Sequence, residues 1–456
     1  MPLGPDDPVR DVPVLEGPTS ADLHVPVLAR VEGEGALHVT VHDGTITDLR
    51  LEIYEPPRFF EGFLRGRGFG EPVDITARIC GICPVAYQMS AAHALERIAG
   101  VHVPPTIREL RRLLYCGEWI ESHVLHLAFL HAPDFLGVPS GIAIAEQHPE
   151  LVRQALELKR LGNEIMEIVG GRPIHPVNVR VGGFWRAPSA AQLHALRPAL
   201  DDAATVAEQL VRWTAGFEFP DLVHDYEFVS LRHPDEYPFN EGRIVSNSGL
   251  DIDVAEFEQV SREVQVAHST ALHSHVIDGD GAGAGAPRPY HVGPLARWAN
   301  DHDLLPACVR DLAADVGVAS VERNPFRSVV VRALEVVYAV GEARRIIDGY
   351  VEPAVAAVEV PPRAGEGWGC TEAPRGILYH RYRTADDGTI VDARIVPPTA
   401  QNQPTIEADV RRVVERWLAT GGPVDALRHA CEHAIRNYDP CISCSTHFLR
   451  VDVDRT

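Results

Sequence analysis

Two Cys-x-x-Cys pairs lie far apart in the chain, and they constrain its fold more than any other feature of the sequence. Cys80 and Cys83 form the first pair, Cys441 and Cys444 form the second, and 357 residues lie between the pairs. Thiolates are soft ligands that suit zinc, iron-sulfur clusters or another thiophilic metal. The pairs of a structural zinc site usually lie within about 15–20 residues of each other. The two pairs can therefore share one site only if the whole fold brings them together. Spacing alone does not decide between a zinc site, a redox-metal site and two unrelated thiol pairs.

Both pairs lie beside predicted helices. The first motif, Arg78-Ile-Cys-Gly-Ile-Cys83, ends directly before a helical pattern at 84–99. Backbone N–H groups and the helix dipole favour a thiolate over a thiol at that position. The second motif, Asp439-Pro-Cys-Ile-Ser-Cys-Ser-Thr-His447, follows a helical pattern at 424–437. We therefore expect metal-binding thiolates at both motifs.

Apolar periodicity predicts a mainly α fold of the α+β class, with a core of long helices and small peripheral β-elements. Hairpins are predicted around Asp43-Gly44 and around Asp387-Gly388. Residues 1–23 contain five prolines and no sustained period, which indicates an extended or disordered arm before one folded domain at 24–447. The predicted helices span residues 84–99, 107–131, 149–169, 189–215, 298–315, 326–357, 406–419 and 424–437.

The charge balance argues against nucleic acid as a partner. The chain has 64 acidic and 42 basic residues, a formal charge of −22, and no basic stretch offsets it locally. The sequence shows no signal peptide and no run of 18 apolar residues. We expect a cytoplasmic protein with no membrane span of its own, whose cysteines stay reduced.

The two cysteine motifs together resemble those of the large (alpha) subunit of nickel-iron hydrogenases. The resemblance covers residues 24–447, and the segments at 84–88 and 232–250 look most like the cytosolic NAD(P)-linked, sulfhydrogenase-like branch. Five further segments follow in the family's order: Arg30-Val-Glu-Gly33, Arg58-Phe-Phe-Glu61, Gly170-Gly-Arg-Pro-Ile-His-Pro176, Tyr290-His-Val-Gly-Pro-Leu-Ala-Arg297 and Glu372-Ala-Pro-Arg-Gly376.

The resemblance implies a site that holds nickel together with an iron carrying carbonyl and cyanide. Cys80 and Cys441 would be terminal nickel ligands, and Cys83 and Cys444 would bridge nickel to iron. The implied activity is the reversible heterolytic cleavage of dihydrogen into protons and electrons. Cys441 would be the base that receives the proton.

Three more residues have implied roles around that site. Glu32 would take the proton from Cys441, although it could instead be a carboxylate paired with Arg30. Arg375 would point its permanent positive charge at the diatomic ligands of iron, unless it is an ordinary ion-pair partner. Thr399 would donate a hydrogen bond to a cyanide.

A second metal, magnesium or a second iron, is also implied. Its ligands would be Glu61, His447 and the backbone carbonyl of Ile395, a donor set that suits a hard or borderline cation. His123 and His126 could also resemble metal ligands, but we expect both to be hydrogen-bonded core residues beside the main site.

Two positions depart from the common family pattern. Tyr87 stands where a histidine often lies four residues after Cys83, and Glu34 replaces the histidine of the R-x-E-G-H form. Since a tyrosine can still donate a hydrogen bond, we expect altered access of gas or protons rather than a loss of activity.

The chain contains no ferredoxin-like run of cysteines, so electrons would have to leave through another polypeptide. The resemblance implies an iron-sulfur small subunit, diaphorase subunits with flavin and iron-sulfur clusters, and nickel-insertion proteins with a peptidase that removes residues 448–456. The alternatives are a respiratory uptake hydrogenase, a zinc-thiolate protein without enzymatic activity, and the related quinone-reducing subunit of respiratory complexes. The intact cysteine pairs argue against the last of these.

Overall fold

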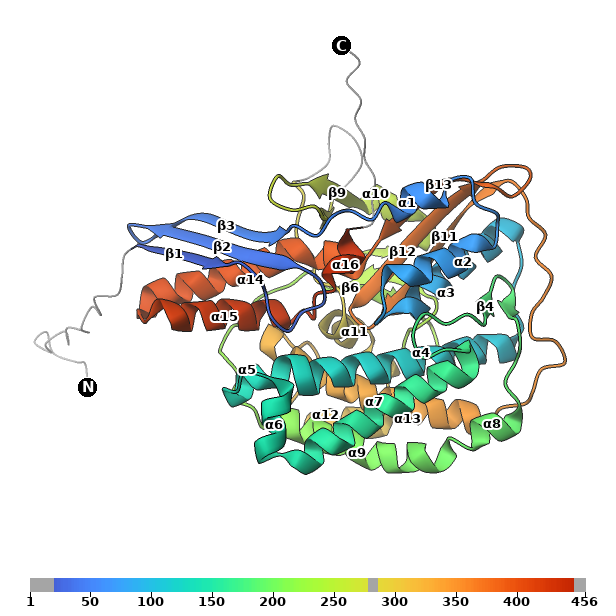
Figure 1. Ribbon diagram of the computed structural model, residues 1–456, viewed down its shortest axis with the longest axis horizontal. Coiled ribbons are helices and arrows are strands. Elements are labelled where there is room, and N and C mark those ends of the chain that lie inside the picture. The colour runs from blue at the N-terminus through green and yellow to red at the C-terminus, as the bar shows by residue number, and fades with distance from the viewer. Residues whose placement is uncertain (1–19, 278–285, 447–456) are drawn as a thin grey trace, which may run out of the picture.

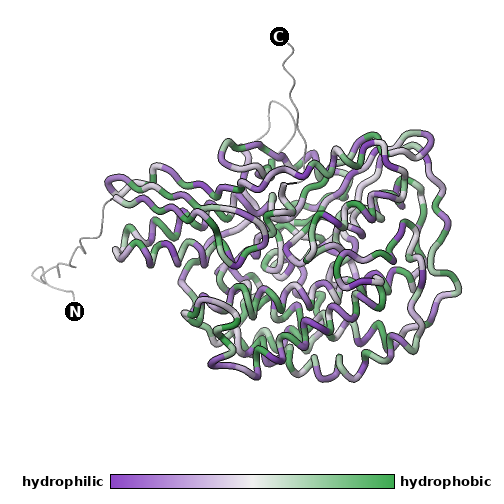
Figure 2. The backbone as a smooth tube through the Cα atoms, viewed as in Figure 1, coloured by the Kyte–Doolittle hydropathy of each residue, from purple (hydrophilic) through white to green (hydrophobic). Residues whose placement is uncertain are grey.

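Four long helices pack side by side in the lower half of the computed structural model, which describes residues 20–277 and 286–446 (Figure 1). They are α4 (Pro105–Leu125), α7 (Pro149–Gly170), α9 (Arg197–Ala215) and α13 (Ser328–Asp348). Hydrophilic and hydrophobic residues alternate along the outer helix α9 in Figure 2, as expected for a helix with one face in solvent. The inner helix α4 is buried on nearly all sides.

Two glycines bring α4 and α7 into close contact. A Cβ atom added at Gly117 would lie 2.8 Å from the carbonyl oxygen of Gly162, and one added at Gly162 would lie 2.7 Å from that of Gly117. Any larger residue at either position would push the two helices apart. This contact fixes α4, whose Glu118 side chain accepts hydrogen bonds from the first turn of α3.

The remaining elements surround this bundle. The other helices are α1 (Phe60–Leu64), α2 (Glu71–Thr76), α3 (Pro84–Ala99), α5 (Ala132–Leu136), α6 (Gly141–Gln147), α8 (Ala190–His194), α10 (Phe257–Val260), α11 (Pro294–Asp301), α12 (Ala307–Asp315), α14 (Pro398–Thr420), α15 (Val424–Arg436) and α16 (Ile442–Ser445). The smaller strands are β4 (Val179–Arg180), β5 (Gly183–Phe184), β6 (Val229–Arg232), β7 (Arg243–Ser246), β8 (Asp251–Ile252), β9 (Ser261–Gln265) and β10 (Leu272–Val276).

An antiparallel sheet of β1 (Ala21–Val25), β2 (Gly35–His42) and β3 (Thr45–Ile53) lies next to α14 and α15 (Figure 1). The inward side chains of the sheet and of both helices form a second hydrophobic core. This packing brings the loop before β2 close to the segment after α15, so residues from the two ends of the described chain meet.

A second antiparallel sheet, β11 (Gly365–Ala373), β12 (Gly376–Thr384) and β13 (Ile390–Val396), packs on α3. Strand β11 approaches α3 so closely that a Cβ atom at Gly369 would lie 2.1 Å from the carbonyl oxygen of Ser90. The pairing of Ala373 with Gly376 leaves Pro374 and Arg375 as a two-residue hairpin turn. The turn therefore projects Arg375 beside the start of α3.

The predicted mainly α fold with small sheets is confirmed, and so are both hairpins. Some predicted helices have different limits. The pattern at 298–315 is two helices because Pro306 interrupts it, and the pattern at 326–357 ends at Asp348 before Gly349. The pattern at 107–131 is α-helical only to Leu125 and continues as a π-helix at His126–His131.

The limits of three other predicted segments also differ. The pattern at 189–215 is broken between α8 and α9, and α14 begins eight residues before the predicted 406 because Pro398 provides a first helical position. Strand β1 begins at Ala21, inside the predicted arm at 1–23. Residues 1–19 and the extension at 448–456 lie outside the described residues.

Candidate metal centre

The four cysteines of the two motifs meet in the interior and form what we call the four-sulfur centre. The Sγ atoms of Cys80 and Cys441 lie 3.3 Å apart, those of Cys83 and Cys444 lie 3.8 Å apart, and those of Cys441 and Cys444 lie 2.8 Å apart. All four side chains are buried, with at most 3% of their surface exposed. The two pairs therefore form one shared site. A single zinc or redox-metal site required this arrangement, and two unrelated thiol pairs would not have shown it.

The first pair is positioned by the start of α3. Backbone N–H groups of Ile82 and Cys83 lie 3.3 and 3.4 Å from the sulfur of Cys80 and can donate to it. The carboxylate of Glu118, on α4, accepts from the N–H groups of Val85 and Ala86 in the first turn of α3. Glu118 was not identified from the sequence, because an acidic residue inside a helical pattern gives no sign that it caps another helix.

The second pair is held by contacts from three distant segments. The N–H of Cys441 donates to the Thr399 hydroxyl oxygen at 3.1 Å, and the N–H of Ile442 donates to the carbonyl oxygen of Glu32 at 2.9 Å. Arg58 joins the two motifs, because its guanidinium donates to the carbonyl oxygens of Ile79 and Ser443. These bonds fix the second cysteine motif against the first.

Glu32 contacts the four-sulfur centre directly. The thiol of Cys441 donates to Oε2 of Glu32 across 2.9 Å, and the backbone N–H of Ser443 donates to the same oxygen at 3.2 Å. The alternative pairing of Glu32 with Arg30 does not occur, because Arg30 binds Asp134 at 2.6 Å.

A second carboxylate lies beside Glu32, and both residues are partly exposed. The Ser443 hydroxyl donates to Oε2 of Glu55 at 3.1 Å, so Ser443 links the two glutamates. Glu55 could not be selected from the sequence, because it lies in no motif and reaches Ser443 only through the fold.

Arg375 presents a buried positive charge to the four-sulfur centre. Its Nη2 lies 2.9 Å from Oδ2 of Asp439 in an ion pair, its Nε donates to the carbonyl oxygen of Asp439, and the side chain is 2% exposed. Burial lowers the pKa of Arg375, but Asp439 and the cysteine sulfurs outweigh it, so the net shift is upward and the side chain stays charged. Within the described residues, Nη1 of Arg375 has no hydrogen-bond partner.

An orphaned guanidinium nitrogen is costly in a dry interior unless a further acceptor occupies the site. Such a nitrogen beside four converging sulfurs fits a buried metal group that carries small acceptor ligands. The Thr399 hydroxyl fits the same group, because its oxygen accepts from Cys441 and its own hydrogen remains able to donate.

The electrostatics of the four thiols also fit a metal. Hydrogen bonding from Cys441 lowers the pKa of Cys80, whereas burial and the neighbouring sulfurs raise the pKa of Cys441. One arginine cannot neutralise four adjacent thiolates, while divalent cations can. Four closely spaced, buried sulfurs are therefore consistent with a thiolate-bound metal group.

Two residues on α3 and β12 pack around the centre. Tyr87 is fully buried, its ring lies 5.7 Å from that of His380, and burial and the sulfur of Cys444 raise its pKa, so the phenol stays protonated. Tyr87 therefore remains able to donate a hydrogen bond, as expected. Glu34 is exposed and lies outside this core.

The two selected histidines are core residues. Nε2 of His123 lies 2.9 Å from Oε2 of Glu335, and burial lowers the pKa of His123 to about 4, so the ring is neutral near pH 7. Nε2 of His126 donates to the carbonyl oxygen of Arg436 at 2.7 Å. The expectation that both are core histidines rather than metal ligands agrees with these contacts.

Part of the predicted second metal site is also described. Oε1 of Glu61 accepts from the N–H of Ile395 at 2.8 Å, so α1 and β13 meet there. Burial and the nearby Glu263 raise the pKa of Glu61 to about 8. A cation at this place would relieve the repulsion between the two carboxylates. His447, the third predicted ligand, lies outside the described residues.

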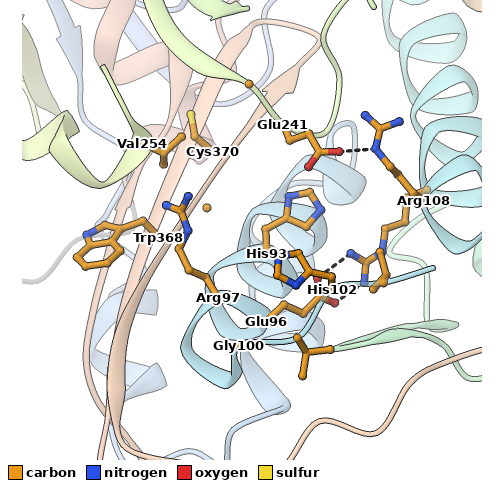
Figure 3. Close-up of a pocket in the computed structure, with 15 residues that line it drawn as sticks. His93, Glu96, Arg97, Gly100, His102, Arg108, Glu241, Val254, Trp368 and Cys370 are labelled. Atoms are coloured by element: carbon orange, nitrogen blue, oxygen red, sulfur yellow. Dashed lines mark hydrogen bonds and ion pairs between the residues drawn. The ribbon is translucent and has the colours of Figure 1, made fainter. Parts of the chain in front are cut away.

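A separate pocket of about 530 Å³ lies at the far end of α3 from the cysteines (Figure 3). Its charged groups are largely paired with each other: Arg108 donates to Glu241, and Arg111 binds Glu96. His93 and His102 also line it. Cys370 lines it, but Cys80, Cys83, Cys441 and Cys444 do not, so this pocket is not part of the four-sulfur centre.

Fold and site together define the subunit of a metalloenzyme built around a buried, four-thiol centre. The family model of nickel-dependent hydrogenases matches residues 58–152 and 288–447, which include all four cysteines. The chain belongs to the nickel-dependent hydrogenase family. The predicted resemblance to the large subunit of these enzymes is thereby confirmed.

Known relatives cover nearly the whole chain. It is 32% identical over 438 residues to the sulfhydrogenase 1 subunit alpha of Pyrococcus furiosus, covering 94% of this chain and 100% of the relative. It is 28% identical over 472 residues to the NAD-reducing hydrogenase HoxS subunit beta of Cupriavidus necator, covering 94% and 95%. These names agree with the predicted branch of the family.

Solved structures show the same fold. An NAD⁺-reducing [NiFe]-hydrogenase in its H₂-reduced state aligns with a TM-score of 0.83 at 27% identity, covering 94% of this chain and 100% of the other. A Ni-Fe-Se hydrogenase from Desulfovibrio vulgaris Hildenborough aligns with a TM-score of 0.70 at 23% identity, with the same coverage.

Within the described residues no single helix is long and apolar enough to span a membrane. One bent pair of helices, Pro105–Leu136 with Gly141–Gln147, meets the length and composition of a membrane span, and by these two criteria only.

Proposed function

We propose that this chain is the catalytic subunit of a hydrogenase that cleaves dihydrogen reversibly and heterolytically. The observation that carries the proposal is the contact of Cys441, one of four convergent sulfurs, with a carboxylate that leads toward solvent. A zinc-thiolate protein would need the sulfurs but would not need Glu32 or Arg375 beside them.

The four-sulfur centre would hold nickel and iron. Cys80 and Cys441 would bind nickel terminally, Cys83 and Cys444 would bridge both metals, and the iron would carry carbonyl and cyanide. When bound, the group supplies the Lewis acidity that polarises dihydrogen and the redox capacity that takes up its electrons. Nη1 of Arg375, which lacks a partner in the described structure, would donate to the diatomic ligands.

The protein's own residues would then remove the proton. Sγ of Cys441 would receive it and pass it over 2.9 Å to Oε2 of Glu32. Ser443 lies between Glu32 and Glu55, so the partly exposed Glu55 is the next acceptor on the way to solvent. The burial of the sulfurs keeps other proton sources away from the centre.

A second cation, magnesium or a second iron, would bind at Glu61 with the carbonyl oxygen of Ile395 and with His447. The raised pKa of Glu61 and the proximity of Glu263 support a cation there, since two carboxylates repel each other without one. Such an ion would tie α1 and β13 to the end of the second cysteine motif.

The electrons would leave through an iron-sulfur small subunit, because this chain has no cluster motif of its own. Since relatives include an NAD-reducing enzyme, we also propose diaphorase subunits with flavin and iron-sulfur clusters, NAD(P) as the final acceptor and a cytoplasmic location. We expect the matured chain, purified alone, to show no dihydrogen-dependent dye reduction, and the complex with its small subunit to reduce the dye. Turnover by the isolated chain at the rate of the complex would contradict this proposal.

We further propose that a peptidase removes residues 448–456 after nickel-insertion proteins have delivered nickel, which leaves His447 as the mature end. Metal binding and the last folding step would then be coupled. Intact-mass measurement should find the shortened form only in protein that contains nickel. Full activity in protein that retains Thr456 would refute this order of events.

A further inference from the structure

A second group of metal-ligand side chains lies outside the four-sulfur centre. One ligand atom each from His268, His273 and Glu407 lies within 4.8 Å of the other two. His268 is in the loop between β9 and β10, His273 is on β10, and Glu407 is on α14. Glu407 is eight residues along α14 from Thr399, or about 12 Å at the rise of an α-helix, so this cluster is separate from the proposed nickel and iron ligands.

The geometry of the cluster fits a metal ion. Nε2 of His268 and Oε1 of Glu407 are 2.9 Å apart, and the rings of His268 and His273 have centroids 5.6 Å apart and are inclined by 80°. Metal–ligand bonds of about 2.0–2.2 Å place neighbouring ligand atoms roughly 3 Å apart. The observed nitrogen–oxygen contact is a hydrogen bond, and its length is close to the spacing of two ligands on one cation.

His273 is the residue that a simple hydrogen-bonded pair does not explain. Its side chain is 3% exposed, and its Nε2 has no hydrogen-bond partner within the described residues. A buried imidazole nitrogen without a partner, beside a second histidine and a carboxylate, is a suitable position for a metal ligand.

The surroundings hold the ligands in place and admit an ion. The N–H of Leu51 donates to Oε1 of Glu407 at 2.9 Å. Such outer contacts orient ligands in known metal sites. A pocket of about 720 Å³ that is lined by His268 and the adjoining loop opens beside the cluster.

We propose that His268, His273 and Glu407 form a separate site for a divalent transition metal of the zinc type, with solvent from the adjoining pocket at the remaining position. Two imidazoles and one carboxylate form a donor set that zinc uses in sites with an open coordination position. The ion would join the β9–β10 hairpin to α14. Arg411, one turn after Glu407, carries a positive charge that would repel the ion. The negative charge of the Glu407 carboxylate offsets this repulsion.

The test is a count of bound zinc in the purified complex after equilibrium with a buffered zinc solution. The variants are His268→Gln, which changes a partly exposed ligand, and His273→Gln, which changes the buried one. The matched control is His42→Gln, because His42 is an exposed histidine 3.1 Å from Asp43 and belongs to no such cluster. The thermal unfolding midpoint of each variant, compared with that of wild type, serves as the check that the variant is folded.

We expect wild type and His42→Gln to bind one zinc more per chain than either cluster variant, and we expect the affinity at this site to fall at least about 100-fold in the variants. Cobalt at the same site should give visible bands without sulfur charge-transfer absorption. Equal zinc content in all four proteins would overturn the proposal. If the extra zinc is lost only when the cysteine thiols are chemically blocked, the proposal is overturned as well. Neither outcome depends on whether the chain is a hydrogenase.

Discussion

Replacing Cys444 with serine is expected to remove nickel and iron from the assembled protein and to lower dihydrogen oxidation at least about a thousandfold, because metal-dependent chemistry is lost with its metal. The sulfur of Cys444 lies 2.8 Å from that of Cys441 and 3.8 Å from that of Cys83, so it contacts both cysteine motifs. A serine oxygen is a poor substitute for a soft bridging thiolate. Elemental analysis and an activity assay check both parts of this prediction.

The matched control is Cys431→Ser. Cys431 is also buried, but it packs in the second hydrophobic core between α14, α15 and the β1–β3 sheet. A buried hydroxyl there costs about 1–3 kcal/mol of stability if it finds no partner, while metal content and turnover should stay near those of wild type. Retention of both metals in Cys444→Ser would show that Cys444 is not a ligand.

Replacing Glu32 with glutamine is expected to abolish most dihydrogen oxidation, by about 100- to 10,000-fold, because the amide cannot relay a proton. Glutamine has nearly the same shape and can still accept from the Cys441 thiol and the Ser443 N–H, so the four-sulfur centre should keep its metals. Conversion between para- and ortho-hydrogen at the centre should persist. The comparison of the two assays separates proton escape from the chemistry at the metals.

Glu34→Gln is the control for the Glu32 variant. Glu34 is a carboxylate two residues away, but it is exposed to solvent. Its replacement should leave oxidation within about twofold of wild type, since surface substitutions of this kind have small effects. If Glu32→Gln oxidises dihydrogen as fast as Glu34→Gln does, protons leave the centre by another route.

Much of the centre could be predicted because its residues lie in short motifs. The two Cys-x-x-Cys pairs predicted the four thiols that meet in the structure, and the family resemblance added Glu32, Arg375 and Thr399. The structure brings Glu32 and Thr399 into hydrogen-bond contact with Cys441. Their exact roles toward bound metals stay predictions.

Contacts that form only through the fold could not be predicted. Asp439 lies in the second cysteine motif, but its contact with Arg375 joins positions 64 residues apart, and Glu118 caps the start of α3 from another helix. Strand β11 was missed because its glycines at 365, 367 and 369 lower strand propensity, although the close packing of β11 on α3 requires small residues. Helix limits failed where prolines or a π-helical turn interrupted an otherwise regular apolar pattern.

The most direct test of the central assignment is the metal content of the purified wild-type complex, measured together with its dihydrogen-dependent activity. The four-sulfur centre, with a buried arginine and a proton-accepting glutamate beside it, predicts one nickel in each copy of this chain and iron beyond that of the small subunit's clusters. Activity should rise in proportion to nickel. Zinc in place of nickel at the four cysteines of active protein would contradict the assignment.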